Sequence, residues 1–188
     1  MKTNVLIAVL FAACAAQTQN LKMIAVRFPA NGSTPTTIQF LCTQTYDRTQ
    51  CVKDATALRR AMSPYPTQIL GTWSFVVVPA DDWKALVRGQ SGDPVSPAFS
   101  MLDQRVTLLD SSLFVASASR NKELLQRFDR IGLALLDLAV THEIGHAICQ
   151  EKNERRADDY GKELRDGKVP DCGVTPGHKP VAVAQNPQ

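Results

Sequence analysis

Residues 131–149 read "IGLALLDLAVTHEIGHAIC", and this stretch decides most of what can be inferred about the fold. The helical pattern begins near Ser119 and continues to Cys149 without a proline. From Ile131 to Val140 the side chains are apolar on nearly every face of a helix. Such a helix belongs in the middle of a domain, with packing on all sides. The sequence therefore predicts a buried central helix.

Two of the three histidines of the chain lie in this stretch, in the order His142-Glu143-x-x-His146. Residues four apart share one face of a helix, so both imidazoles can point at a single ion. Imidazole suits Zn²⁺, which accepts tetrahedral coordination with one position left for water. Glu143 lies beside that position and can take a proton from a zinc-bound water. The motif predicts zinc-dependent hydrolysis of an amide bond, with Glu143 as the catalytic base.

A catalytic zinc site needs a third protein ligand. A histidine six residues past the second is excluded because that position is Lys152, and the remaining histidine, His178, lies in a Pro- and Gly-rich tail. Glu154 is the better candidate, since it opens a second expected helix after a short turn. Asp158 follows one helical turn later, where its carboxylate can accept a hydrogen bond from a histidine N–H.

The segment "ERRADDYGKEL" resembles the Glu-x-x-Ala-Asp-x-x-Gly-x-x-Leu segment of the gluzincin metallopeptidases, a group that includes the ImmA/IrrE-type peptidases. Together with the motif His142-Glu143-x-x-His146, the resemblance covers residues 139–165. It implies a zincin-like domain in which Glu154 is the metal ligand and Asp158 supports the site. The chain departs from the family in one respect, because only seven residues separate His146 from Glu154. This short spacing leaves Asp158 or Asp159 as alternative ligands.

The sequence before the central helix alternates between strand and helix patterns. Strands are expected at residues 21–28, 38–46, 72–80 and 104–116, and helices at 52–62 and 81–89. Segment 72–80 is β-branched and aromatic, which is typical of a buried strand. Segment 104–116 is either the free sheet edge on which a substrate strand docks or an ordinary core strand. The fold class is α+β: a small mixed sheet packed on the helix of the two histidines and on the following helix that bears Glu154.

The beginning of the chain is interpreted as an export signal. Residues 1–16 have a basic start, an apolar run of about a dozen residues and small residues before polar sequence. This run is shorter than the roughly 20 residues of a membrane span. We expect cleavage after Ala16 or, alternatively, lipid attachment at Cys14. The zincin-like domain would cover residues 17–166, with an irregular tail at 167–188, and the protein would be periplasmic or secreted.

The other four cysteines are even in number, which in an exported chain indicates disulfide bonds. Three pairings are possible. The pairs Cys42–Cys51 and Cys149–Cys172 are favoured because each joins sequence neighbours across polar, loop-like sequence.

The charges of the chain identify no particular partner. Lys and Arg total 21 and Asp and Glu total 18, and they are interspersed without a basic block, so nucleic acid is not indicated. The prediction is a zinc metallopeptidase, similar to a metalloendopeptidase, with Zn²⁺ as its cofactor and a peptide or protein as substrate. The alternative is a non-catalytic zincin-like module that docks a protein partner.

Overall fold

The computed structural model describes residues 23–26, 38–90 and 92–173. The expected export signal, Cys14 and His178 lie outside these residues, as does most of the expected tail. The strands are β1 (Met23–Val26), β2 (Ile38–Thr43), β3 (Trp73–Val78), β4 (Ala98–Met101) and β5 (Val106–Asp110). The α-helices are α2 (Arg48–Met62), α3 (Ala80–Gly89), α4 (Ala118–Phe128), α5 (Gly132–Cys149) and α6 (Glu154–Arg165). Short 3-10 helices are η1 (Thr67–Leu70), η2 (Leu102–Gln104) and η3 (Ser111–Leu113).

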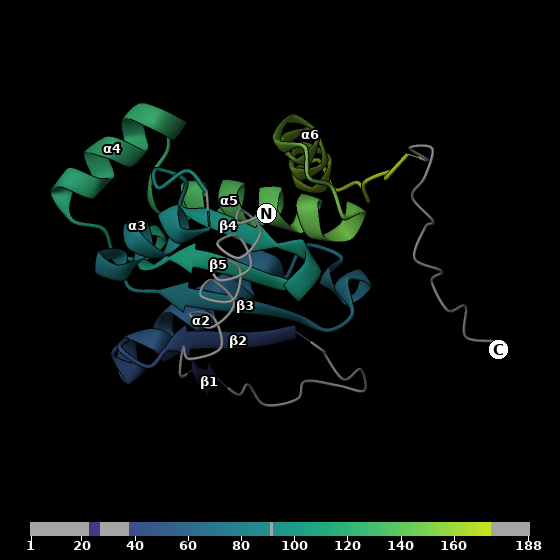
Figure 1. Ribbon diagram of the computed structural model, residues 1–188. Coiled ribbons are helices and arrows are strands. Elements are labelled where there is room, and N and C mark those ends of the chain that lie inside the picture. Colours follow the sequence, from purple (N-terminus) through teal and green to yellow (C-terminus); the bar gives the residue numbers. More distant parts are fainter. Residues whose placement is uncertain (1–22, 27–37, 91, 174–188) are drawn as a thin grey trace, which may run out of the picture.

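The five strands form one mixed sheet in the order β1-β2-β3-β5-β4, as Figure 1 shows from bottom to top. Strands β2, β3 and β5 are parallel, whereas β1 and β4 pair with their neighbours in the antiparallel direction. The predicted α+β class with a mixed sheet is therefore confirmed. Helices α2 and α5 contribute to the core cluster on one face, and α3 packs on the other through Trp83 and Val87.

The free edge of the sheet near the central helix is β4, so of the two alternatives for segment 104–116 the inner strand is the one found and the edge strand is not. Strand β5 lies between β3 and β4 and stops at Asp110, whose side chain accepts a hydrogen bond from the Ser112 backbone N–H. The reason is that the short strand β4 pairs along the outer side of β5. Its residues, Ala98-Phe99-Ser100-Met101, do not alternate between apolar and polar, so the sequence gives no strand pattern there.

Helix α5 lies in the core from Leu135 onward, as its apolar sequence predicts, whereas its first turn is exposed, with Leu133 at 77 %. Leu135, Leu136, Val140 and Ile144 are each 1 % exposed or less. The helical pattern is interrupted before it, because Asp129 adopts a left-handed conformation (φ 54°) at the end of α4 and separates the two helices. Within the described residues no single helix is long and apolar enough to cross a membrane; α4 and α5 meet that test only as a pair, bent by 55°.

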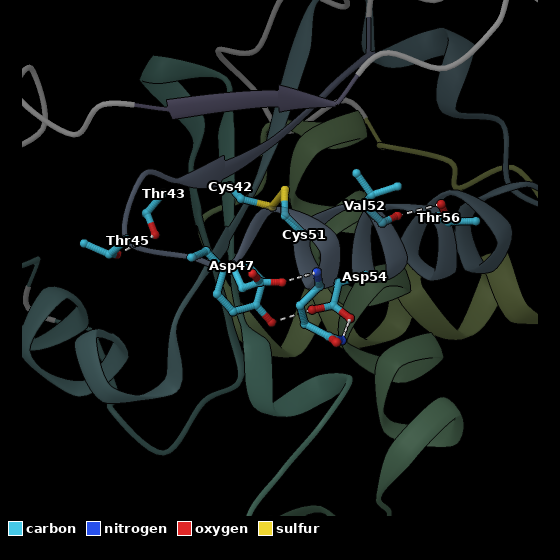
Figure 2. The surroundings of a disulfide bond; sticks show 10 residues. Cys42, Thr43, Thr45, Asp47, Cys51, Val52, Asp54 and Thr56 are labelled. Atoms are coloured by element: carbon cyan, nitrogen blue, oxygen red, sulfur yellow. Dashed lines mark hydrogen bonds between the residues drawn. A yellow bond between two sulfur atoms is a disulfide. The ribbon is translucent and has the colours of Figure 1, made fainter.

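Both favoured disulfide bonds are present. Cys42–Cys51 joins β2 to the first turn of α2, next to Asp47, which caps that helix by accepting a hydrogen bond from the Gln50 backbone N–H (Figure 2). Because of this cap, α2 begins four residues earlier than the expected segment 52–62. Cys149–Cys172 ties the end of α5 to the segment after α6. Two such bonds favour an oxidising compartment.

Candidate metal centre

Helix α6 folds back on α5 after a tight turn, and three local features produce this reversal. Gln150 ends α5 in a left-handed conformation (φ 50°), with its backbone N–H bonded to the His146 carbonyl. Asn153 then caps α6 by accepting a hydrogen bond from the Arg156 backbone N–H at 3.1 Å, as the spacing predicts for a helix that starts at Glu154. Small residues at the crossing let α6 lie close to α5 (Figure 1), and Glu154 in the first turn of α6 reaches both histidines.

Three side chains each place one atom that could bind a metal ion (called a donor atom below) at a common point. The Nε2 atoms of His142 and His146 are 3.0 Å apart. Glu154 Oε2 lies 3.1 Å from the first of them and 3.5 Å from the second. The structure therefore brings together the three residues that the sequence suggested, and such a group could hold a metal ion.

The outer nitrogen of each imidazole is held by a hydrogen bond that determines its tautomer. His146 Nδ1 lies 2.5 Å from the backbone oxygen of Glu151, and a carbonyl oxygen can only accept, so Nδ1 carries the proton. His142 Nδ1 lies 2.8 Å from Asp158 Oδ1 and donates to that carboxylate. In neutral imidazoles both Nε2 atoms then present lone pairs to each other and to Glu154 Oε2. Three acceptors at such short distances repel one another unless a proton or a metal ion lies among them.

Asp158 thus lies where the sequence placed a supporting carboxylate, on the outer nitrogen of His142. Asp159, which was an alternative ligand, is exposed and is not among the residues that line the adjoining cavity. The second alternative, Asp158 itself, contacts Nδ1 and not the Nε2 side where the donor atoms converge. Among the described acidic residues of α6, the geometry favours Glu154 as the third ligand.

Glu143 is buried beside this cluster, with 3 % of its surface exposed. Its Oε2 atom has no hydrogen-bond partner among the described residues. Burial raises the pKa of the Glu143 carboxyl, while the neighbouring His142 and His146 act in the opposite direction. A buried polar atom without a partner is costly, and Oε2 has room for a hydrogen bond that none of the described residues supplies.

A cavity of about 820 Å³ opens beside the cluster. It is bounded by the edge strand β4 on one side and by α5 and the start of α6 on the other. Its polar part contains Glu143 and the three donor residues. Its apolar part is lined by residues from η2, the end of α4 and the first half of α5, namely Leu102, Phe128, Leu135, Leu138 and Ala139.

Sequence reasoning missed two residues that contact the candidate site. The Glu151 carbonyl orients His146. Every residue has a backbone carbonyl, so this contact cannot be predicted from the type of residue at position 151. Ser100 lies in β4, which was not recognised as a strand. Ser100 lines the same cavity as Glu143, and its side chain acts to lower the pKa of the Glu143 carboxyl.

Comparisons of the chain with models of protein families, with curated proteins and with solved structures give no match. The likeness to gluzincins remains a resemblance of two short motifs within residues 139–165. A function is therefore inferred from the chemistry of the residues themselves.

Proposed function

We propose that this protein is a zinc-dependent metallopeptidase that hydrolyses peptide bonds in a peptide or protein. The observation that carries the proposal is the buried Glu143 carboxylate with an unpartnered Oε2 atom, next to three convergent donor atoms. The Oε2 atom has no partner among the described residues, and a carboxylate oxygen in that position suits a base that works on a bound water molecule.

The donor set fits zinc. Two imidazole nitrogens and one carboxylate oxygen are the ligand types of a catalytic zinc site with one open position. In a tetrahedral site with ligands about 2.05 Å from the ion, the ligand atoms are about 3.3 Å apart. The separations of 3.0, 3.1 and 3.5 Å agree with that value. Bound zinc would supply Lewis acidity, which polarises a carbonyl group and lowers the pKa of water.

The residues around the donor atoms would then have different roles in hydrolysis. Glu143 accepts a proton from the attacking water and passes one to the departing amine, so that the carboxylate is regenerated. Asp158 and the Glu151 carbonyl hold the imidazoles with their Nε2 atoms inward. The apolar walls around Glu143 exclude bulk water and so strengthen these interactions.

A peptide is a suitable substrate because β4 is a sheet edge that borders the cavity. An extended peptide can pair with the free side of such a strand through main-chain hydrogen bonds. This arrangement would lay the peptide across Glu143, with one side chain directed into the apolar part of the cavity. We therefore expect cleavage next to a bulky apolar residue.

The proposal is tested with a diverse peptide library and the Glu143→Gln variant. The zinc-loaded wild-type protein should cleave peptides, and excess chelator should abolish the cleavage. Glu143→Gln should bind zinc as tightly as the wild type and lose at least about 100-fold in turnover, because the base is removed and the ligands remain. Full activity in this variant would refute the mechanism.

The same experiment separates the proposal from a zincin-like module that only docks a protein partner. Zinc binding without any chelator-sensitive cleavage by the wild type would favour the docking module. The buried, unpartnered Glu143 oxygen would then have no chemical purpose, which is why hydrolysis is preferred.

A further inference from the structure

The backbone of Glu151 contacts His146 twice. Its N–H donates to the His146 carbonyl at 3.0 Å, and its own carbonyl accepts from His146 Nδ1 at 2.5 Å. The first contact fixes the end of α5, and the second fixes the rotation of the imidazole. Both depend on the conformation of the turn at residues 150–153, because they are made by backbone atoms of that turn.

The side chain of Glu151 holds the turn in this conformation. Its Oε1 atom accepts hydrogen bonds from the backbone N–H groups of Lys152 at 3.0 Å and Asn153 at 2.9 Å. Hydrogen bonds to a charged acceptor are roughly twice as strong as those between neutral groups. Asn153 in turn caps α6, whose first residue is Glu154. One carboxylate therefore fixes the backbone between the two candidate ligands His146 and Glu154.

The second oxygen of this carboxylate forms an ion pair with α6. Arg156 Nε lies 3.1 Å from Glu151 Oε2. An ion pair that is open to water contributes little by itself. Here the guanidinium is also held by Tyr160, because Nη2 donates to the phenol oxygen at 2.6 Å. Tyr160 is 6 % exposed and packs on α5, where a Cβ at Gly145 would lie 3.0 Å from Tyr160 Cβ.

We propose that the side chains of Glu151, Arg156 and Tyr160 form a clasp that positions His146 and Glu154 for a shared metal ion. The clasp rests on the proposed function in so far as these donor atoms bind zinc. Glu151 is a positioning residue in this arrangement and not a ligand, since it acts on His146 through its backbone carbonyl.

The first test measures zinc affinity by competition with a chromophoric chelator. Glu151→Ala should bind zinc about 10–100-fold more weakly, as is usual when the partner of a ligand is disturbed. Glu151→Gln should recover part of the loss, because its amide oxygen can still accept from the two backbone N–H groups but carries no charge for Arg156. Arg156→Met should resemble Glu151→Gln, and combining the two should add little. Wild-type affinity in Glu151→Ala would overturn the clasp.

Lys84→Met is the matched control for Arg156→Met. Lys84 forms a partly exposed ion pair with Glu123 at 3.2 Å, and neither residue lines the cavity beside the donor atoms. This variant should leave zinc affinity unchanged. An equal loss of affinity in Lys84→Met and Arg156→Met would show a general effect of removing an ion pair, and it would overturn the role of Arg156.

The second test needs neither activity nor metal. The tautomer of His146 is read by NMR from the imidazole nitrogens of the metal-free protein, at a pH where the imidazoles are neutral. The wild type should carry the proton on Nδ1, whereas Glu151→Ala should also populate the Nε2–H form, because the carbonyl no longer holds Nδ1. Lys84→Met should resemble the wild type.

An unchanged tautomer in Glu151→Ala would overturn the positioning of His146, even if the variant were less stable. If the wild-type protein binds zinc and cleaves nothing, the proposed function fails, while zinc affinity and the tautomer still decide whether the clasp exists. If it binds no zinc, the tautomer alone decides.

Discussion

Gly161 of α6 packs directly against the backbone of His142 in α5. A Cβ atom at position 161 would lie 3.0 Å from the His142 nitrogen and 3.2 Å from its Cα. The contact is reciprocal, since a Cβ at Gly145 would lie 2.9 Å from the Ala157 carbonyl oxygen. The two helices therefore meet backbone to backbone. This close approach is what allows Glu154, on the first turn of α6, to reach the imidazoles.

Adding a methyl group at this crossing should disturb the candidate metal centre. Gly161→Ala and Gly145→Ala force the helices apart and should each destabilise the fold by about 1–3 kcal/mol, as overpacking does. Zinc affinity should fall too, because Glu154 moves with α6. These effects can be measured by urea unfolding and by competition with a chromophoric chelator.

Gly89→Ala is the matched control for the crossing, since a Cβ at this helical position would meet nothing within 4 Å. It should leave zinc affinity unchanged and stabilise the protein by about 0.5–1 kcal/mol. Unaltered zinc affinity in Gly161→Ala would show that the crossing does not set the ligand geometry.

Zinc affinity should rank the acidic residues of α6 by their distance from the donor cluster. Glu154→Ala removes a converging oxygen and should weaken binding most. Asp158→Ala removes the acceptor for His142 Nδ1 and should cost about 10–100-fold, as is usual for a partner of a ligand. Asp159→Ala is the control and should have no effect. If Asp158→Ala bound zinc more weakly than Glu154→Ala in a titration, Asp158 would be the ligand.

The two disulfide bonds should differ in their effect on zinc. Replacing both cysteines of either pair with serine should lower stability by roughly 3 kcal/mol, because the unfolded chain loses a cross-link. Only the Cys149/Cys172 double variant should also weaken zinc binding, since Cys149 ends α5 two residues before Glu151, whose carbonyl orients His146. Cys42–Cys51 joins β2 to α2, which supply no donor atom. Equal zinc affinities for the two double variants would contradict this role.

Stability at alkaline pH should depend on Tyr65. Burial, together with the hydrogen bond that its hydroxyl donates to Asp137, raises the pKa of Tyr65 to about 12. The folded protein therefore keeps a proton that the unfolded chain releases near pH 10. The stability contributed by this group is fully present below about pH 10 and is lost as the pH rises through about 12.

Tyr65→Phe tests this dependence. The variant should be less stable than the wild type at pH 8 by about 1 kcal/mol, the usual value of a lost hydrogen bond. Its stability should then decline less steeply between about pH 10 and 12, when urea midpoints are measured in steps across that range. Parallel curves for the two proteins would rule out a contribution from Tyr65.

Local features of the fold could be predicted from sequence. The strand at 72–80 and the helix at 154–165 match their residue patterns, because period and capping act over a few residues. The break between α4 and α5 was not predicted. It occurs at Asp129, which adopts a left-handed conformation, and neither a proline nor a glycine marks that position. Strand β4 was missed because its existence depends on pairing with β5, a partner found only in the folded chain.

The sequence by itself determined that His142, Glu143 and His146 share a buried helix, because a spacing of four residues acts within a single turn. It also indicated both disulfide pairs. Only the tertiary structure decided that Glu154 faces the Nε2 atoms while Asp158 faces Nδ1, since this depends on how closely α6 crosses α5 at Gly145 and Gly161. It likewise decided which strand forms the edge of the sheet, because strand order is a non-local property that no short stretch of the chain contains.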